Sequence, residues 1–152
     1  MITSLRKINL YLSFLSFWKI PLLFYCRPKV VFIDDTTIKV RVKLRRRVKN
    51  HLGSMYLGAL TIGADITAGY FAFHFLQMHK KKISLIFKDF HADFYKRSIG
   101  DVEFICTMGP EIKDMIEKSI STSNRVNLPV TVNALVPSIS DEIVAKFIFL
   151  SL

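Results

Sequence analysis

Cysteine is scarce in this chain of 152 residues, and the two cysteines present do not form a cluster. Cys26 and Cys106 lie far apart without the spacing of metal ligands, and none of the four histidines completes such a spacing. This scarcity argues against a disulfide framework and against a zinc centre. We therefore expect two reduced thiols, no bound metal, and a cytoplasmic protein for which association with a membrane is the alternative.

Acidic residues are also few, because 12 Asp and Glu stand against 22 Lys and Arg, which gives a formal charge of +10. Such a balance favours anionic partners, namely nucleic acid, lipid headgroups or phosphorylated small molecules. The basic residues are not interleaved with aromatic residues in a nucleic-acid-binding motif, so we expect no nucleic-acid partner. A solvated basic surface without a partner is the alternative.

The apolar stretches are interrupted, although hydrophobic residues make up 51% of the chain and the mean hydropathy is +0.31. Lys19 and Pro21 interrupt the segment from Ile8 to Cys26, and no small-x-small cleavage site follows, which argues against a signal sequence. Asp65 lies near the middle of the segment from Met55 to Leu76, where a carboxylate inside a membrane would be costly. Buried helices are therefore favoured over membrane spans.

The pattern of apolar residues predicts an α+β fold. The expected elements are a helix over 5–18, strands over 29–33 and 38–45, a long helix over 54–76, strands over 83–98 and 102–108, a short helix over 110–120, and strands over 125–136 and 143–152. Along 38–45 apolar and basic residues alternate, which predicts one buried and one basic face. We expect an antiparallel sheet wrapped around one long central helix, with 1–28 as an apolar helix and lead-in and 29–152 as the main domain.

The long helix contains Gly58, Gly63 and Gly69, each of which costs up to about 1 kcal/mol relative to alanine. Close approach of backbone or ligand is the usual reason for such glycines. At the N-terminus of the helix, the Gly58 N–H could polarise a carbonyl. Asp65 follows seven residues later, roughly 10 Å along the axis. One chain cannot bring both groups to one carbonyl, so a joint site would require two subunits.

The segment NHLGSMYLGALTIGAD, residues 50–65, resembles the active-site segment of the hot-dog-fold acyl-CoA thioesterases of the phenylacetyl-CoA (PaaI-like) type. Asn50, Gly53, Gly58 and Asp65 match the family pattern, and the order of elements over roughly 29–152 is also similar to that fold. The resemblance thus implies a hot-dog fold with an extra N-terminal helix.

Two positions depart from the family pattern. Tyr56 stands where the family usually has a histidine, and Leu57 replaces the first glycine of a pair. A motif of the type Asn-His-x-Gly-Ser-x-Tyr-x-Gly-Ala-Leu is similar to an uncharacterised branch of the superfamily. The two departures put the usual acyl geometry in question, because Leu57 narrows the entrance to the pocket.

The resemblance implies hydrolysis of an acyl thioester by homodimers, often paired into tetramers, with coenzyme A as part of the substrate and no separate cofactor. Asp65 of one subunit would be the nucleophile or general base, the Gly58 N–H of the other would polarise the carbonyl, and Asn50 would position the water or the carboxylate. Substrate contacts would come from Gly53, Ser54, Tyr56 and Leu57. Candidates for binding the phosphates of coenzyme A are Arg45, Arg46, Arg47, Lys80, Lys81 and Lys82.

Each of these residues also has a purely structural interpretation. Asp65 could be a buried acid paired with a lysine or a backbone amide, and the glycines could serve close packing. Tyr56 could be a core aromatic, and Asn50 could cap the turn into the helix.

Three functions follow as hypotheses. The first is a hydrolase for a thioester of coenzyme A or of acyl carrier protein. The second is a non-catalytic protein that binds an acyl chain or thioester. The third is a peripheral membrane protein that attaches through the N-terminal helix.

Overall fold

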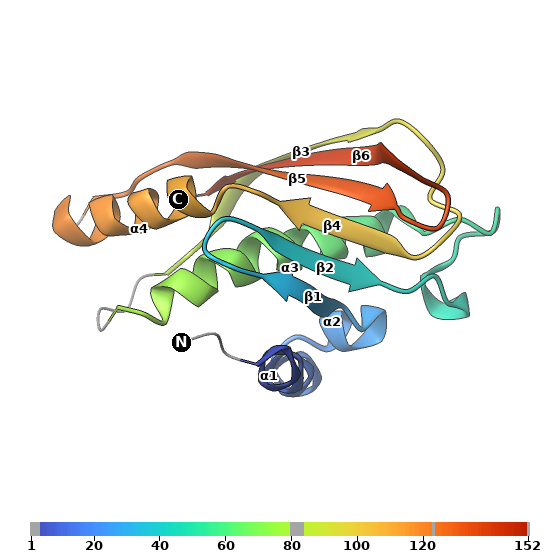
Figure 1. Ribbon diagram of the computed structural model, residues 1–152, viewed down its shortest axis with the longest axis horizontal. Coiled ribbons are helices and arrows are strands. Elements are labelled where there is room, and N and C mark those ends of the chain that lie inside the picture. The colour runs from blue at the N-terminus through green and yellow to red at the C-terminus, as the bar shows by residue number, and fades with distance from the viewer. Residues whose placement is uncertain (1–3, 80–83, 123, 152) are drawn as a thin grey trace.

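The protein folds as one antiparallel sheet curved around a long helix. The computed structural model describes residues 4–79, 84–122 and 124–151. The strands are β1 (Lys29–Ile33), β2 (Ile38–Val42), β3 (Phe87–Phe94), β4 (Val102–Cys106), β5 (Leu128–Val136) and β6 (Ser140–Ser151). They are ordered β1-β2-β4-β5-β6-β3, so that β1 and β3 form the two edges. This is the predicted α+β arrangement, seen in Figure 1 with α3 running beneath the sheet.

Helix α3 (Leu57–Leu76) fills the concave side of the sheet, because its small residues let strands approach closely. A Cβ atom at Gly63 would lie 2.2 Å from the ring of Phe104 on β4, so only glycine fits that contact. Phe71, about two turns further along α3, is fully buried. Among the described helices, α3 alone is long and apolar enough to cross a membrane, and 61% of its most apolar window is buried in the core.

Strand β2 confirms the predicted two-faced pattern. Ile38, Val40 and Val42 are fully buried, whereas Lys39 and Arg41 lie on the outer face. A tight turn joins β1 to β2, in which Asp34 Oδ1 accepts hydrogen bonds from the backbone N–H groups that follow it. These bonds lower the pKa of the Asp34 carboxyl.

Helix α1 (Leu5–Trp18) forms over the predicted residues and packs against the β1 edge, and α2 (Pro21–Cys26) follows it. The side chain of Asn9 bonds both backbone groups of Val30: its Nδ2 donates to the Val30 oxygen at 2.8 Å, and its Oδ1 accepts from the Val30 nitrogen at 2.9 Å. Leu12 and Leu23 are part of the common core. Figure 1 shows α1 end-on, below the sheet.

Several boundaries differ from the sequence prediction. Helix α2 was not expected, because Pro21 indicated only the end of a helix; proline instead occupies the first position of a new one. The short 3-10 helix η1 (Arg46–Val48) was not expected either. Strand β3 is shorter than the predicted range 83–98, and its pairing with β6 shifts register between Phe87 and Asp89. Helix α4 (Gly109–Thr122) begins beside Asp35, whose oxygen would lie 2.1 Å from a Cβ at Gly109.

Candidate active site at the edge of strand β3

The loop that precedes α3 is held together by Asn50. Its Oδ1 accepts hydrogen bonds from the N–H groups of Leu52 at 2.9 Å and Ser54 at 3.1 Å, and its Nδ2 donates to Ser54 Oγ at 3.0 Å. Gly53 has a φ of +78°, a conformation that favours glycine. These residues give the loop one shape, and the Asn50 side chain is engaged within its own turn.

The N-terminus of α3 leaves backbone amides free. Tyr56 caps the helix without a side-chain hydrogen bond, and its carbonyl accepts the first bond, from the Leu60 N–H at 3.1 Å. Within the described parts of the chain, nothing accepts a hydrogen bond from the Gly58 N–H. The Tyr56 ring lies beside it, since a Cβ atom at Gly58 would be 2.9 Å from Tyr56 Cε1. Tyr56 and Leu57 are 57% and 55% exposed, so Tyr56 is not a core aromatic in the single chain.

Asp65 opens into a groove between α3 and the β3 edge. The groove has a volume of about 430 Å³ and is lined by Thr61, Ile62, Asp65, Phe87, Lys88, Asp89, Phe90 and Phe149. No described residue donates a hydrogen bond or forms an ion pair with the Asp65 carboxyl, and desolvation raises its pKa. The described residues therefore do not support the structural interpretation, in which a lysine or a backbone amide of the same chain pairs with Asp65. A half-buried carboxylate in an apolar groove has the environment of a general base.

The same groove borders an open edge of the sheet. Among the described strands β3 pairs only with β6, and Phe90 and Phe94 are 43% and 46% exposed along it. An unpaired edge with exposed rings is suited to pairing with another chain. Gly58 does not line the groove, so the single chain presents the carboxylate and the free amide at separate places on α3.

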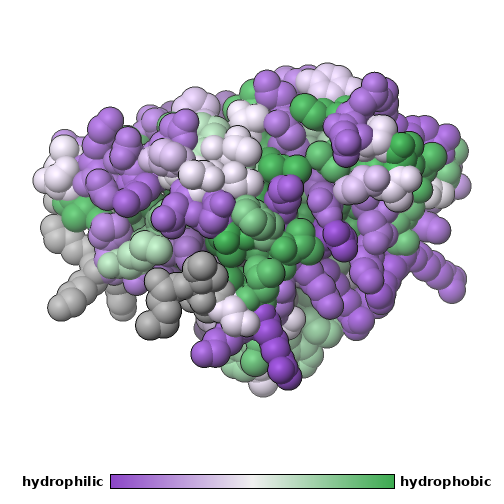
Figure 2. All heavy atoms as spheres, in the orientation of Figure 1, coloured by the Kyte–Doolittle hydropathy of each residue, from purple (hydrophilic) through white to green (hydrophobic). Residues whose placement is uncertain are grey.

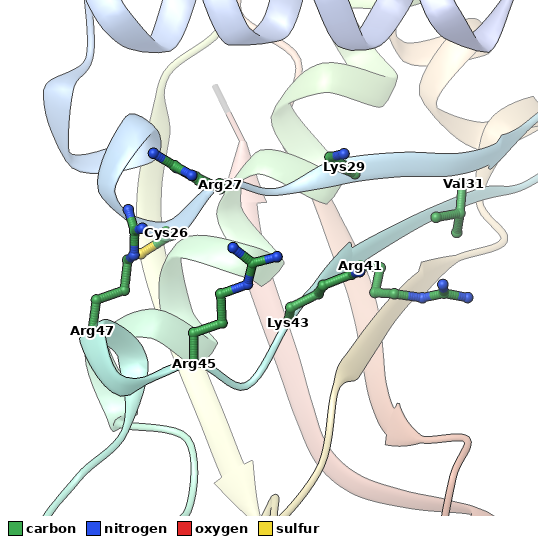
Figure 3. Close-up of a pocket in the computed structure, with 8 residues that line it drawn as sticks. All are labelled: Cys26, Arg27, Lys29, Val31, Arg41, Lys43, Arg45 and Arg47. Carbon is green, nitrogen blue, oxygen red and sulfur yellow. The ribbon is translucent and has the colours of Figure 1, made fainter.

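A second cavity, the basic pocket, lies on the outer face of β1 and β2, at the other end of the strand order. It has a volume of about 310 Å³ and is lined by Cys26, Arg27, Lys29, Val31, Arg41, Lys43, Arg45 and Arg47. Figure 3 shows the cationic side chains around the pocket, which come from the end of α2, from β1 and β2, and from the segment that leads through η1. Arg41 pairs with Glu103 through Nη2 and Oε1 at 2.5 Å.

Comparison with known families identifies this arrangement. The family described as "Domain of unknown function (DUF4442)" matches residues 10–144, from α1 into β6. The chain belongs to the DUF4442 family. The matched range includes the loop, Gly58 and Asp65. No curated protein matches the chain.

Solved structures show the fold of this DUF4442 chain. A protein of unknown function from Chlorobaculum tepidum has a TM-score of 0.81 at 10% identity, over 97% of this chain and 94% of its own. A candidate thioesterase from Shewanella oneidensis has a TM-score of 0.79 at 13% identity, over 96% of both chains. Zebra fish thioesterase superfamily member 2 has a TM-score of 0.69 at 10% identity, over 97% and 96%. The fold is the hot-dog fold of these structures, as the segment from Asn50 to Asp65 indicated.

The DUF4442 fold separates the predicted site residues into three places. Asn50, Gly53 and Ser54 form the loop, Tyr56, Leu57 and Gly58 form the helix N-terminus, and Asp65 lies in the groove. Arg45 and Arg47 line the basic pocket on β1 and β2, and Arg46 is exposed beside them. Lys80, Lys81 and Lys82 lie outside the described residues.

The groove also contains residues that sequence reasoning missed. Thr61 and Ile62 precede Asp65 by four and three positions, so helical spacing alone could have placed them on its face. Phe90 and Phe149 come from two strands whose pairing the sequence did not reveal. In the basic pocket, Arg27 and Lys29 were missed because only the alternation along β2 was considered.

Proposed function

We propose that the protein hydrolyses an acyl thioester at an interface between two copies of the chain. The observation that carries this proposal is the carboxyl of Asp65, which has no partner among the described residues, in a largely apolar groove and on the same helix as the Gly58 N–H, which likewise has no described acceptor. A thioester carbonyl needs a donor for its developing negative charge and a base or nucleophile for attack. Gly58 and Asp65 have the spacing of the two groups in the thioesterase family that the segment resembles. Structures with the same fold include proteins named as thioesterases.

Two subunits are required because α3 holds the groups apart. Gly58 and Asp65 are seven residues apart on one continuous helix, about 10 Å along its axis. Pairing of two β3 edges would place the groove of one chain against the other chain, so that its Asp65 could face the partner's Gly58 amide. We infer a homodimer, which could pair further into a tetramer.

The proposed roles follow from the local chemistry. Asp65 acts as a carboxylate, either as general base toward water or as nucleophile toward the thioester carbon. Desolvation makes it a stronger base than a surface aspartate. The Gly58 amide stabilises the oxyanion, and the loop held by Asn50 positions the start of α3. Tyr56 and Leu57 lie at the surface where the acyl or thiol portion would enter.

The thiol carrier is coenzyme A, or acyl carrier protein, and acts as part of the substrate. Positive charge favours either anionic carrier. Both cysteines are buried, and burial raises the pKa of Cys106 to about 11, so that neither serves as a nucleophile. Free buried thiols fit the cytoplasm, where we place this activity.

One observation favours the second candidate, a protein that binds the thioester without cleaving it. The Tyr56 ring lies directly beside Gly58 and occupies space near the amide that an oxyanion would need. In this case the groove holds an acyl chain and Asp65 contacts the ligand without catalysis.

Thiol release from a panel of acyl-CoA thioesters distinguishes the two functions. Wild type should hydrolyse at least one chain length, and Asp65→Asn should lower kcat by about 100-fold or more, because the amide is neither base nor nucleophile. Asp114→Asn on the exposed face of α4 removes the same charge and should leave turnover unchanged. Binding of thioesters with no turnover at any chain length would support the binder, and equal turnover by Asp65→Asn would remove Asp65 from its role.

A further inference from the structure

The net positive charge of this protein comes from one part of the chain. Residues 1–64 contain twelve Lys and Arg and only two acids, the adjacent Asp34 and Asp35, whereas residues 65–152 contain ten of each. All twelve cations of the first part lie between Arg6 and Lys49, in the part of the chain that forms α1, α2, β1, β2 and η1, so the net charge of +10 belongs to the elements beside the β1 edge. The proposed thioester site at the β3 edge does not account for this asymmetry.

An apolar surface, the α1–α2 patch, lies in the same half. Helix α1 buries Ile8 and Leu12, yet its other side is also apolar. The patch consists of Leu10, Phe14, Phe17, Trp18, Leu22, Phe24 and Tyr25, all exposed, with Phe14 at 63% and Trp18 at 66%. At the lower end of the molecule, where Figure 1 places α1, Figure 2 shows hydrophobic atoms beside hydrophilic ones.

Ring contacts make this patch continuous across the two helices. Phe17 lies 5.5 Å from Trp18 and 5.3 Å from Phe24, measured between ring centroids. Leu10, Phe14 and Trp18 follow one another at four-residue spacing along one line of α1. A contiguous exposed apolar surface of this kind marks a site of interaction with a protein or a membrane.

The patch adjoins the basic pocket through two arginines. The Arg27 guanidinium lies 5.5 Å from the centroid of the Phe24 ring, and the Arg47 guanidinium lies 5.7 Å from that of Tyr25. Six cations line the pocket, no acidic side chain is part of its described lining, and Arg41 alone among them has a described acidic partner, Glu103. Because five of these six cationic side chains have no described acidic partner, the pocket is suited to bind phosphate groups.

We propose that the α1–α2 patch and the basic pocket together form a docking surface for an anionic lipid bilayer. The aromatic and leucine side chains lie at the boundary between headgroups and acyl chains, and the pocket binds lipid phosphate groups. A bilayer offers both chemistries side by side. A second copy of this chain would bring an equally positive surface against the first, which opposes self-association through this face.

This surface leaves the proposed catalytic edge accessible. The patch and the pocket border β1, whereas the groove of Asp65 borders β3, at the other end of the strand order. Docking and dimerisation therefore use different edges of one sheet. The proposal does not depend on thioester hydrolysis.

Binding to vesicles tests this proposal with a built-in probe. Trp18 is the sole tryptophan of the chain and lies in the patch, so its emission reports on the patch alone. With the full-length chain, vesicles containing phosphatidylglycerol should shift the emission to shorter wavelength and sediment the protein. Partition should be at least about tenfold stronger than for phosphatidylcholine vesicles, and high salt should weaken it.

Matched variants separate charge from general surface effects. Lys43→Glu with Arg45→Glu should lower partition by about tenfold or more. Lys113→Glu with Lys118→Glu, which makes the same charge change on exposed α4, should have less than a third of that effect. Phe14→Ser with Leu22→Ser should abolish the Trp18 shift, whereas Ile139→Ser, an exposed site elsewhere, should not.

Three outcomes would overturn the proposal. One is equal partition onto the two kinds of vesicle, and another is equal loss in the two charge variants. The third is a patch variant that changes the sedimenting mass of the protein without changing vesicle binding, which would make the patch a contact between proteins.

Discussion

Asp65 carries a charge that the surrounding residues do not compensate. Its carboxyl is half-buried and lacks a described partner, and this desolvation raises its pKa. A raised pKa means that the folded chain holds its proton more tightly than the unfolded chain does. Folding stability at this residue therefore falls as the pH rises from the unfolded pKa, about 3.9, through the raised folded value.

Asp65→Asn should consequently stabilise the protein at neutral pH. Above the folded pKa of Asp65 the wild-type carboxylate is charged and poorly solvated, whereas the amide is not. Below pH of about 4 both side chains are neutral, so the difference in unfolding free energy should shrink toward zero. Urea denaturation of both proteins across this pH range measures it. A variant that is less stable at pH 7 would mean that the carboxylate has a stabilising partner.

For single residues, the sequence predicted which positions matter better than it predicted what their side chains do. The spacing of Asn50, Gly58 and Asp65 indicated the fold, but the helix that was predicted to begin at residue 54 begins at Leu57, and the groove beside Asp65 was not predicted. The spacing also did not reveal that the Asn50 carboxamide forms hydrogen bonds with Ser54 in its own turn. Such bonds depend on the conformation of the loop, which the spacing of residues does not give. The roles of Asn50 and Asp65 in chemistry remain predictions.

Two glycines of helix α3 differ in the space that surrounds them. Gly63 faces the fully buried Phe104 ring, where a Cβ would lie 2.2 Å away, whereas a Cβ at Gly69 would find its nearest atom, on Phe87, at 3.8 Å. The first glycine is required by packing. The second has room for a methyl group.

Gly63→Ala should therefore lower the unfolding free energy by about 1–3 kcal/mol, because the fixed ring cannot move aside without strain. Gly69→Ala is the matched control in the same helix and should raise it by up to about 1 kcal/mol through better helix propensity. Thermal or urea unfolding of both variants measures the two effects. Equal effects of the same sign would contradict the packing argument.

Element boundaries were predictable where periodicity was strong. The alternation along β2 and the small residues of α3 identified both elements, since burial on one face or all around leaves a regular pattern. Helix α2 was missed because proline can end one helix and begin another. The prediction for strand β3 was too long, because an exposed edge strand lacks a regular pattern of buried residues and most residues of β3 are exposed.

At the scale of the whole molecule, the proposed two-subunit site predicts that two inactive variants can restore activity when they pair. Asp65→Asn and Gly58→Pro should each be inactive, the first without the carboxylate and the second without the amide N–H, since proline is tolerated in a first helical turn. When the two variants are mixed and re-paired, half of the dimers are mixed, and one of their two sites has both groups. Activity should recover to about a quarter of wild type.

Thiol release before and after co-refolding provides the measurement, with sedimentation to verify that dimers form. Recovery requires that the carboxylate and the amide come from different chains. No recovery, with mixed dimers present, would place both groups in one subunit and contradict the interface site. The edge at which a second chain would pair was not predictable from helix and strand patterns, because it depends on the order of the strands in the sheet.

The contact between Asn9 and Val30 bears on how the sheet can grow. One carboxamide takes the place of a neighbouring strand by satisfying both the N–H and the C=O of an edge residue on β1. Added strands can then extend the sheet at β3 but are blocked at β1 near this point. A sheet with one sealed and one open edge forms a closed pair and stops, whereas two open edges would permit an endless ribbon. A single asparagine thus leaves β3 as the edge at which another chain could extend the sheet.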